Sequence, residues 1–135
     1  MARITVVDDN PDFLETMFSI LDGVEGHDVA GFAGNTTTIE ELVASDPELL
    51  IVDLRIAGDD MRGWDILMLA RAHDSLRRVP LIVCSGDTQT LRARAVEFAR
   101  IGNVYTLEKP FGLDDVISLV DRVLAEQPPR SEMAS

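Results

Sequence analysis

The 135-residue sequence is poor in cysteine, in long apolar runs and in basic residues, and each shortage excludes a class of protein. It contains a single cysteine, Cys84, so no disulfide can form within the chain. No apolar run approaches the roughly 20 residues that a membrane-spanning helix needs, and the early charges argue against a signal peptide. We therefore expect a cytoplasmic protein that does not insert into a membrane.

Basic residues are also scarce. The chain has 12 lysines and arginines against 24 aspartates and glutamates, which gives a formal net charge of −12 at pH 7. Such a chain repels the phosphates of nucleic acids and the headgroups of anionic lipids. We expect no nucleic-acid binding by this chain, and partners that are proteins or cations.

Apolar residues are abundant, at 46% of the chain, which is typical of a folded globular domain. Short apolar runs alternate with amphipathic stretches along the sequence. This alternation predicts an α/β fold in which helices sandwich a five-stranded parallel sheet. The expected strands span residues 3–7, 27–33, 48–54, 80–85 and 103–107, and the expected helices span residues 10–23, 36–45, 62–74, 88–102 and 113–126.

Local signals refine these boundaries. Asn10 is a suitable cap for the first helix, Pro11 suits its first turn, and Gly23 is expected to end it. A single domain is predicted over residues 1–125, followed by a flexible tail over 126–135, where two prolines occur without periodicity. The inner face of the helix over 62–74 is expected to carry Trp64, Leu67, Met68 and Ala72.

Polar side chains stand at the carboxyl ends of four of the five expected strands. These ends meet at one edge of a parallel sheet, where such folds bind ligands. Carboxylates brought together repel one another unless a cation intervenes, and oxygen ligands suit a hard cation such as Mg²⁺. An ammonium can pair with phosphate oxygens, and a hydroxyl can donate a hydrogen bond to an oxyanion. The residues are Asp8 and Asp9 after the first strand, Asp53 in the third, Ser85 in the fourth and Lys109 after the fifth.

Together these groups predict a phosphoryl-transfer site at which an aspartyl phosphate forms. Asp53 is the expected nucleophile, because it stands alone and centrally. Asp8 and Asp9 form a pair suited to holding the metal. The opposite view of each residue, as an ordinary turn or surface residue, does not account for their joint position at the strand ends.

Other kinds of site are disfavoured. No glycine-rich fingerprint follows the first strand, which weighs against a dinucleotide-binding enzyme. Phosphatases with an Asp-x-Asp nucleophile motif need a second carboxylate two residues after the first, where this chain has Arg55 after Asp53. His27 and His73 lack ligand spacing to Cys84, so no zinc site is predicted.

Four motifs in this order, VVDDNP, LLIVDL, LIVCSG and LEKPF, resemble those of the receiver domains of two-component response regulators. The resemblance implies a flavodoxin-like fold of five βα units with strand order 2-1-3-4-5. It implies that a histidine kinase or a phosphotransfer protein donates a phosphoryl group from phosphohistidine to Asp53. The protein would then be a signalling phosphoacceptor rather than an enzyme. Because the match uses nearly the whole chain, we expect a stand-alone regulator that signals to or relays through a downstream protein.

The resemblance also implies the ligands of the metal. Mg²⁺ would be held by Asp8, Asp9, Asp53 and the backbone carbonyl of Arg55. The face formed by the fourth helix, the fifth strand and the fifth helix would be the signalling surface.

The remaining roles concern the phosphoryl group and the switch that reports it. The resemblance implies that Ser85 contacts the phosphoryl group, that Lys109 pairs with it, and that the Lys109–Pro110 bond is cis. Pro110 is grouped with Ser85, Tyr105 and Thr106 as a candidate switch residue. In this family an aromatic residue three places before the lysine commonly takes part in the switch with Ser85; here Thr106 stands there, and Tyr105 comes one place earlier. Because adjacent strand residues face opposite sides, Tyr105 is predicted to be a surface ring. A second hypothesis therefore stays open, a receiver-fold binding module whose output does not depend on phosphorylation.

Overall fold

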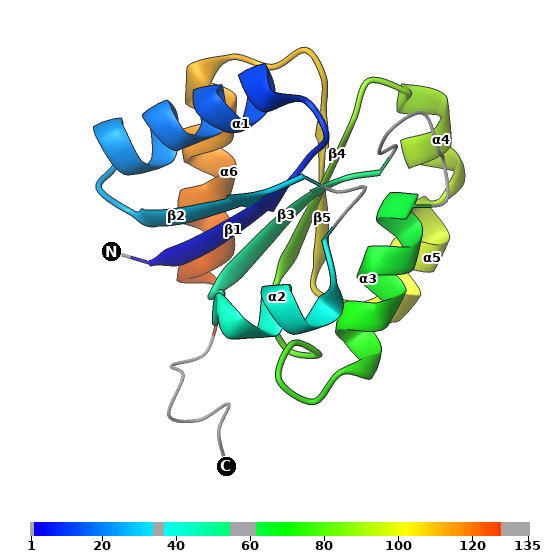
Figure 1. Cartoon of the computed structure of the whole chain (residues 1–135). Coiled ribbons are helices and arrows are strands. Elements are labelled where there is room, and N and C mark those ends of the chain that lie inside the picture. The colour runs from blue at the N-terminus through cyan, green and yellow to red at the C-terminus, as the bar shows by residue number, and fades with distance from the viewer. Residues whose placement is uncertain (1, 34–36, 55–61, 128–135) are drawn as a thin grey trace.

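A parallel sheet of five strands forms the centre of the computed structural model, which describes residues 2–33, 37–54 and 62–127 (Figure 1). Its strand order is β2-β1-β3-β4-β5, as the resemblance implied. The strands are β1 (Arg3–Val7), β2 (Asp28–Phe32), β3 (Leu49–Asp53), β4 (Leu81–Ser85) and β5 (Val104–Glu108). The helices are α1 (Pro11–Phe18), the π-helical η1 (Ser19–Val24), α2 (Ile39–Ala44), α3 (Arg62–Ala72), α4 (Thr88–Ala93), α5 (Ala95–Ile101) and α6 (Leu113–Ala125).

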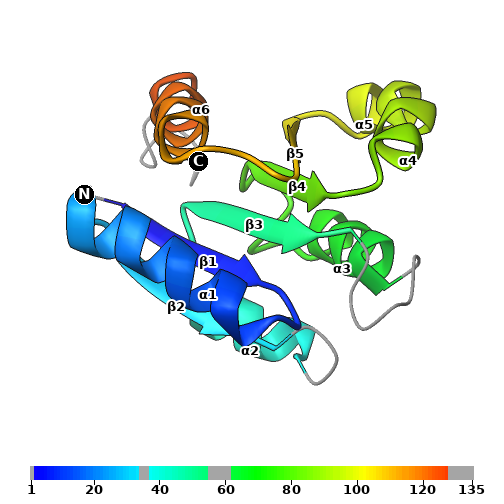
Figure 2. The ribbon, with the colours of Figure 1, turned by 90° about the horizontal axis from the view of Figure 1, so that it is seen from above.

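Helices cover both faces of the sheet (Figure 2), and on each face a hydrophobic layer of side chains holds them in place. One layer packs α1, η1 and α6 against the sheet, and the other packs α2, α3, α4 and α5. Strands β3 and β4 are buried along their whole length, because both of their faces are covered. The fold is therefore the three-layer α/β sandwich expected from the alternation of apolar runs.

The first helix begins as predicted and ends later. The side chain of Asn10 caps α1, and Pro11 occupies its first turn. The predicted stop at Gly23 is wrong, because the helical backbone runs on as η1 to Val24. The residue with left-handed backbone is Gly26, at φ 73°, and it takes the role that the prediction gave to Gly23.

The single helix expected over 88–102 is two helices in the structure. Helices α4 and α5 meet at Arg94, whose backbone leaves the helical region at φ −100° and ψ 6°. The Arg94 guanidinium lies 4.5 Å from the centre of the Trp64 ring and pairs with Glu97 at 3.2 Å. The break therefore coincides with a contact to α3, which the sequence around residue 94 does not reveal.

The inner face of α3 is turned by about one residue from the prediction. Leu67 is buried and Trp64 is partly buried as expected, but Met68 and Ala72 are exposed. The reason is steric. Gly63 faces the end of β3, where a Cβ would overlap the carbonyl oxygens of Asp53 and Leu54, and this fixes which side of α3 turns inward. The buried residues of the helix are Gly63, Ile66, Leu67 and Ala70.

The end of the chain falls largely outside the described residues. Of the predicted tail, Glu126 and Gln127 are described, and 128–135 are not. The Tyr105 hydroxyl donates a hydrogen bond to Glu126 at 2.9 Å, and the Gln127 amide donates one to Asn103 at 3.2 Å. The boundary at residue 125 and the flexibility of the tail stay predictions. Within the described part of the chain, no helix is both long and apolar enough to cross a bilayer.

Candidate functional site

Three of the predicted site residues meet at the carboxyl edge of the sheet. Asp8 directly follows β1, Asp53 is the last residue of β3, and Lys109 directly follows β5. The Lys109 ammonium donates hydrogen bonds to Asp8 Oδ2 and to Asp53 Oδ2, each at 3.1 Å. Lys109 is the only lysine in the chain. One cation therefore bridges the ends of three strands that are far apart in the sequence.

The alternation of side chains along a strand explains why these groups share one side of the sheet. Leu49 and Ile51 face the layer that contains α1 and α6, so Asp53, two residues on, faces the same way. In β5, Leu107 packs against that layer, and Lys109 follows it by two residues. The pattern that buries the core therefore also aims the charged groups.

Asp8 is completely buried, and this burial dominates its acidity. Burial raises the pKa of Asp8 to about 6, although the backbone N–H of Asn10 at 2.9 Å and the Lys109 charge both oppose the rise. The nearby Asp53 carboxylate adds to it. A site with this much concentrated negative charge favours the binding of a cation.

Lys109 is held from several directions. Burial alone would lower the pKa of Lys109, but the charges of Asp53 and Asp8 and their hydrogen bonds outweigh it, so that the pKa is raised. Its backbone N–H donates to the Ser85 carbonyl at 2.8 Å, which ties the end of β5 to β4. The Lys109–Pro110 bond is cis, as the resemblance implied.

The acidic residues offer a set of ligands that suits a hard cation. Asp8, Asp9 and Asp53 can each supply one carboxylate oxygen such that these atoms all lie within 4.8 Å of one another. Asp8 and Asp53 are buried, and Asp9 is exposed. Oxygen ligands that include an exposed carboxylate fit Mg²⁺, which keeps several of its waters when bound to a protein. The backbone carbonyl predicted to join them, that of Arg55, lies outside the described residues.

Ser85 lies at the end of β4 and is buried. Its hydroxyl oxygen accepts a hydrogen bond from the backbone N–H of Asp87 at 3.0 Å, and Asp87 in turn caps α4. The preceding residue, Cys84, is the register partner of Asp53. Burial raises the pKa of the Cys84 thiol to about 12, so the thiol stays protonated and inert at neutral pH.

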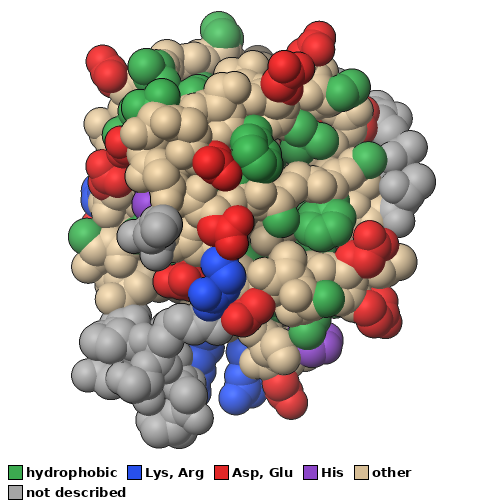
Figure 3. Space-filling model, turned by 60° about the vertical axis from the view of Figure 1, so that its left-hand side comes forward, with side chains coloured by type: hydrophobic (Ala, Val, Ile, Leu, Met, Phe, Trp, Pro, Cys, Tyr) green, Lys and Arg blue, Asp and Glu red, His purple; other side chains and the backbone are tan. Residues whose placement is uncertain are grey.

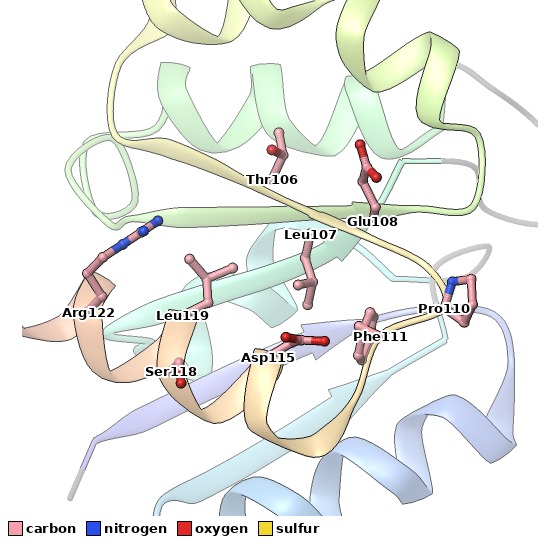
Figure 4. A pocket seen from close by; sticks show the side chains of 9 residues that line it. All are labelled: Thr106, Leu107, Glu108, Pro110, Phe111, Asp115, Ser118, Leu119 and Arg122. Atoms are coloured by element: carbon pink, nitrogen blue, oxygen red, sulfur yellow. The ribbon is translucent and has the colours of Figure 1, made fainter.

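The two candidate switch residues face opposite sides of β5 from one another. Tyr105 packs against the layer that contains α6, and the Arg122 guanidinium lies 6.0 Å from the centre of its ring. Thr106 is exposed, and Figure 4 shows its side chain pointing away from that of Leu107 across the strand. The predicted offset is confirmed, but the ring of Tyr105 is partly buried against α6 rather than free on the surface.

A groove of about 510 Å³ runs between β5 and α6 (Figure 4). Thr106, Leu107 and Glu108 line it from the strand, and Leu119 and Arg122 line it from the helix. It belongs to the fifth-strand and last-helix part of the surface that the resemblance assigns to signalling. Pro110, which was grouped with the switch residues, closes one end of it together with Phe111.

Two residues at the site were missed by reasoning from the sequence. The ring of Phe13, from α1, lies against the Lys109 ammonium, at 4.1 Å from the ring centre. Gly63 starts α3 against the end of β3, and a Cβ there would overlap the carbonyl oxygens of Asp53 and Leu54. Neither residue belongs to a strand-end motif, so only the packing of the helices brings them to the site.

Comparisons with known proteins agree with this geometry. The family model described as the response regulator receiver domain matches residues 4–121. The regulatory protein AtoC of Escherichia coli is 32% identical over 135 residues, an alignment that covers 97% of this chain and 27% of AtoC. The chain spans about a quarter of the length of AtoC and of the NtrX regulators that it also matches.

Solved structures share the fold at lower identity. The chemotaxis response regulator CheY4 of Vibrio cholerae superimposes with a TM-score of 0.78 at 20% identity, covering 91% of this chain and 98% of CheY4. The receiver domain of the sensor histidine kinase PA1611 of Pseudomonas aeruginosa superimposes with a TM-score of 0.72 at 21% identity, covering 93% of this chain and 98% of that domain. The PA1611 domain was solved with a magnesium ion coordinated in its active site cleft.

Proposed function

Because the chain belongs to the response regulator receiver domain family, we propose that Asp53 accepts a phosphoryl group from a phosphohistidine of a histidine kinase or phosphotransfer protein. The observation that carries this proposal is the Lys109 ammonium, which lies 3.1 Å from both Asp53 and Asp8. A carboxylate beside a fixed cation, at the strand ends where ligands bind, is arranged for phosphoryl transfer. The protein acts as a signalling phosphoacceptor and not as an enzyme with a separate substrate.

The reaction needs a nucleophile and positive charge around the phosphoryl oxygens. A carboxylate oxygen of Asp53 forms a bond to phosphorus while the bond from phosphorus to the donor's imidazole nitrogen breaks, and its electron pair stays on the imidazole. The signal ends when the aspartyl phosphate is hydrolysed. Water attacks phosphorus, the Asp53 carboxylate leaves, and the proton lost by the water passes to solvent or phosphate. Lys109 holds its charge next to the nucleophile, where the phosphoryl oxygens gather negative charge.

Mg²⁺ is the proposed cofactor. Asp8, Asp9 and Asp53 would hold it, since they offer mutually close carboxylate oxygens and no softer ligand. When bound, Mg²⁺ supplies positive charge that offsets the charge of the phosphoryl group and of the carboxylates. Ser85 is proposed to turn its hydroxyl toward the phosphoryl group, giving up the hydrogen bond that it accepts from Asp87.

The surface charge supports protein partners. Acidic side chains are spread over the face shown in Figure 3, and most of the basic ones in view lie in its middle and lower part. Together with the net charge of −12, this supports a phosphodonor protein and a downstream protein as partners, rather than nucleic acid. A cytoplasmic location is part of the same proposal.

A second function is favoured by one observation. Thr106 stands where the family commonly has an aromatic switch residue, and the neighbouring ring of Tyr105 is engaged with α6 through its hydrogen bond to Glu126. A receiver-fold module without a working aromatic switch can bind its partner regardless of phosphorylation. The phosphoacceptor function is the better supported of the two, because such a module has no use for the Asp8, Asp53 and Lys109 arrangement.

The test is intact mass spectrometry after incubation with phosphoramidate, whose phosphorus–nitrogen bond imitates that of phosphohistidine. We expect the wild type to gain one phosphoryl group in the presence of Mg²⁺ and to gain none after chelation. Asp53→Asn should gain none, whereas Asp65→Asn, which removes an exposed carboxylate of α3, should behave as the wild type. Failure of the wild type to form an adduct with phosphoramidate and also to bind Mg²⁺ in calorimetry would overturn the proposal in favour of the binding module.

A further inference from the structure

The aromatic contact to Lys109 stands out because no strand-end motif requires it. The Lys109 ammonium lies 4.1 Å from the centre of the Phe13 ring. The rings of Phe13 and Phe111 meet edge to face, with an angle of 77° between their planes and 5.9 Å between their centres. Phe13 is thus itself held in place, by a neighbour on the segment that leads from β5 into α6.

The face of an aromatic ring attracts a cation, most strongly where water is excluded. Among the described residues, three groups fix the position of the ammonium: the carboxylates of Asp8 and Asp53 and the ring of Phe13. The two carboxylates are also the groups proposed to hold Mg²⁺, and a bound divalent cation weakens their attraction for Lys109 and repels it. The ring is neutral and is not a ligand for the metal, so its hold on the ammonium does not depend on the charge of the carboxylates.

The surroundings of the ring fit this role. Phe13 and Lys109 both line an open hollow of about 540 Å³, together with Thr16, Gly86, Pro110 and Phe111. The side chain of Lys109 is 25% exposed, so water reaches it from the hollow, and a ring on one side reduces that access. A partly desolvated ammonium acts more strongly on nearby negative charge.

We propose that Phe13 is a positioning residue for phosphoryl transfer: its ring holds the Lys109 ammonium beside Asp53 while the metal occupies the carboxylates. The inference rests on the proposed function of Asp53. It adds a residue of α1 that lies outside the strand-end motifs and acts through Lys109 without touching the reacting atoms.

A graded change of the ring tests this role with little change of shape. Phenylalanines with one, two and three fluorine atoms at position 13 withdraw electron density from the ring face and weaken its attraction for a cation. We expect the rate of phosphoryl-adduct formation with phosphoramidate to fall step by step, by about three- to thirtyfold across the series. The same fluorinated residues at Phe18, which is 46% exposed on the same helix, should leave the rate unchanged. The fall should appear in the rate at saturating donor rather than in the donor concentration needed for half saturation.

A spectroscopic readout reports the contact without phosphorylation. Because Lys109 is the only lysine, ¹³C-labelled lysine gives the signals of this side chain alone. A proton above a ring face is shielded, so the Lys109 methylene signals of the Mg²⁺-loaded full-length chain should lie upfield of their usual positions. Phe13→Leu should abolish this shift, Phe13→Tyr should preserve it, and Phe18→Leu should leave it intact.

The outcomes separate the two proposals. A stepwise fall with fluorination at position 13, together with the upfield shift in the Mg²⁺-loaded wild type, supports the positioning role. Two results would overturn the role of Phe13 and leave the phosphoacceptor function standing. One is a rate of adduct formation that does not change with fluorination at position 13. The other is an upfield shift that disappears when Mg²⁺ is added. A wild type that neither forms the adduct nor binds Mg²⁺ in calorimetry overturns both, whatever the shift.

Discussion

Two partly buried cations at opposite edges of the same sheet are held in different ways. At the carboxyl edge, Lys109 donates to the carboxylates of Asp8 and Asp53. At the amino edge, the guanidinium of Arg71, from α3, donates to backbone carbonyl oxygens that precede β4 and β5. These oxygens belong to Leu76, Val79, Gly102 and Asn103, at 2.8 to 3.4 Å.

The difference separates a site that can respond from one that holds the fold together. Carbonyl oxygens do not titrate, so the environment of Arg71 is the same across the neutral pH range. Burial lowers the pKa of Arg71, but a guanidinium keeps its charge at neutral pH. Asp8, one of the two partners of Lys109, can gain a proton near its raised pKa of about 6. Both partners also offer oxygens to a metal ion, and either change alters the forces on the ammonium. An ammonium held by carboxylates, as in Lys109, suits a signalling site. A guanidinium held by neutral carbonyls, as in Arg71, suits a structural role.

Removing the guanidinium at the amino edge should have the largest effect on stability. Arg71→Met removes the guanidinium that donates to four carbonyls before β4 and β5, and we expect the free energy of unfolding to fall by roughly 2–4 kcal/mol. Urea unfolding measures this loss. Arg100→Met, an exposed residue of α5, is the matched control and should change little. Adduct formation per folded molecule should be unchanged, and a variant that loses phosphorylation while folded would contradict the division between the two edges.

Crowding the carboxyl edge should lower stability and chemistry together. In Gly63→Ala the added methyl group overlaps the carbonyl oxygens of Asp53 and Leu54, and both are backbone atoms that yield only by moving β3. We expect a loss of about 1–3 kcal/mol in unfolding free energy and slower adduct formation. Gly23→Ala, where nothing lies within 4 Å of the added Cβ, is the control and should leave both quantities near the wild type. Equal behaviour of the two alanine variants would mean that Gly63 does not position Asp53.

Neutralising the buried acid should stabilise the protein in a pH-dependent way. The pKa of Asp8 rises from 3.8 to about 6 on folding, so the folded state binds more protons than the unfolded state between these values. Wild-type stability should therefore fall as the pH rises from about 4 to about 6. Asp8→Asn removes this loss at the expense of one ion pair with Lys109, for a net gain of about 1–2 kcal/mol at pH 7.

Urea unfolding of both proteins at several pH values measures this gain. The advantage of Asp8→Asn should be mostly lost near pH 4 and should vanish at lower pH, where the wild-type carboxyl is protonated in both the folded and the unfolded state. Mg²⁺ should stabilise the wild type at pH 7 and have less effect on the variant. An advantage of the same size at pH 4 and pH 7 would show that the ionisation of Asp8 is not its cause.

The smallest effect is expected away from both edges. Tyr105→Phe removes the hydroxyl that donates to Glu126 at a partly exposed position, and should cost about 0.5 kcal/mol of unfolding free energy. The ring and its packing against α6 stay in place, so adduct formation should not change. Glu126→Gln, which keeps an acceptor oxygen, should be closer to the wild type. A clear loss of phosphorylation-dependent partner binding in Tyr105→Phe would instead show that this ring takes part in signalling.

Much of the candidate site could be predicted from the sequence, because strand periodicity is a local property. Alternating side chains that bury Leu49 and Ile51 also aim Asp53, and the same rule applies to Lys109. The expected bounds of the first strand agree with those of β1, because a short β-branched run followed at once by a capped helix leaves few alternatives. The offset between Tyr105 and Thr106 followed from the same rule.

What tertiary structure alone decided lies on the helices and between them. The Phe13 ring on Lys109, the close approach of Gly63 to β3 and the carbonyl cluster around Arg71 all depend on how elements distant in sequence meet. The same is true of the break at Arg94 beside Trp64. A helical period tells which side of a helix is apolar, but not its exact rotation or which residue meets a given neighbour. The sequence by itself determined which groups reach the carboxyl edge of the sheet, because each strand orients its own side chains. Tertiary packing decided what surrounds those groups, because their surroundings depend on all three layers at once.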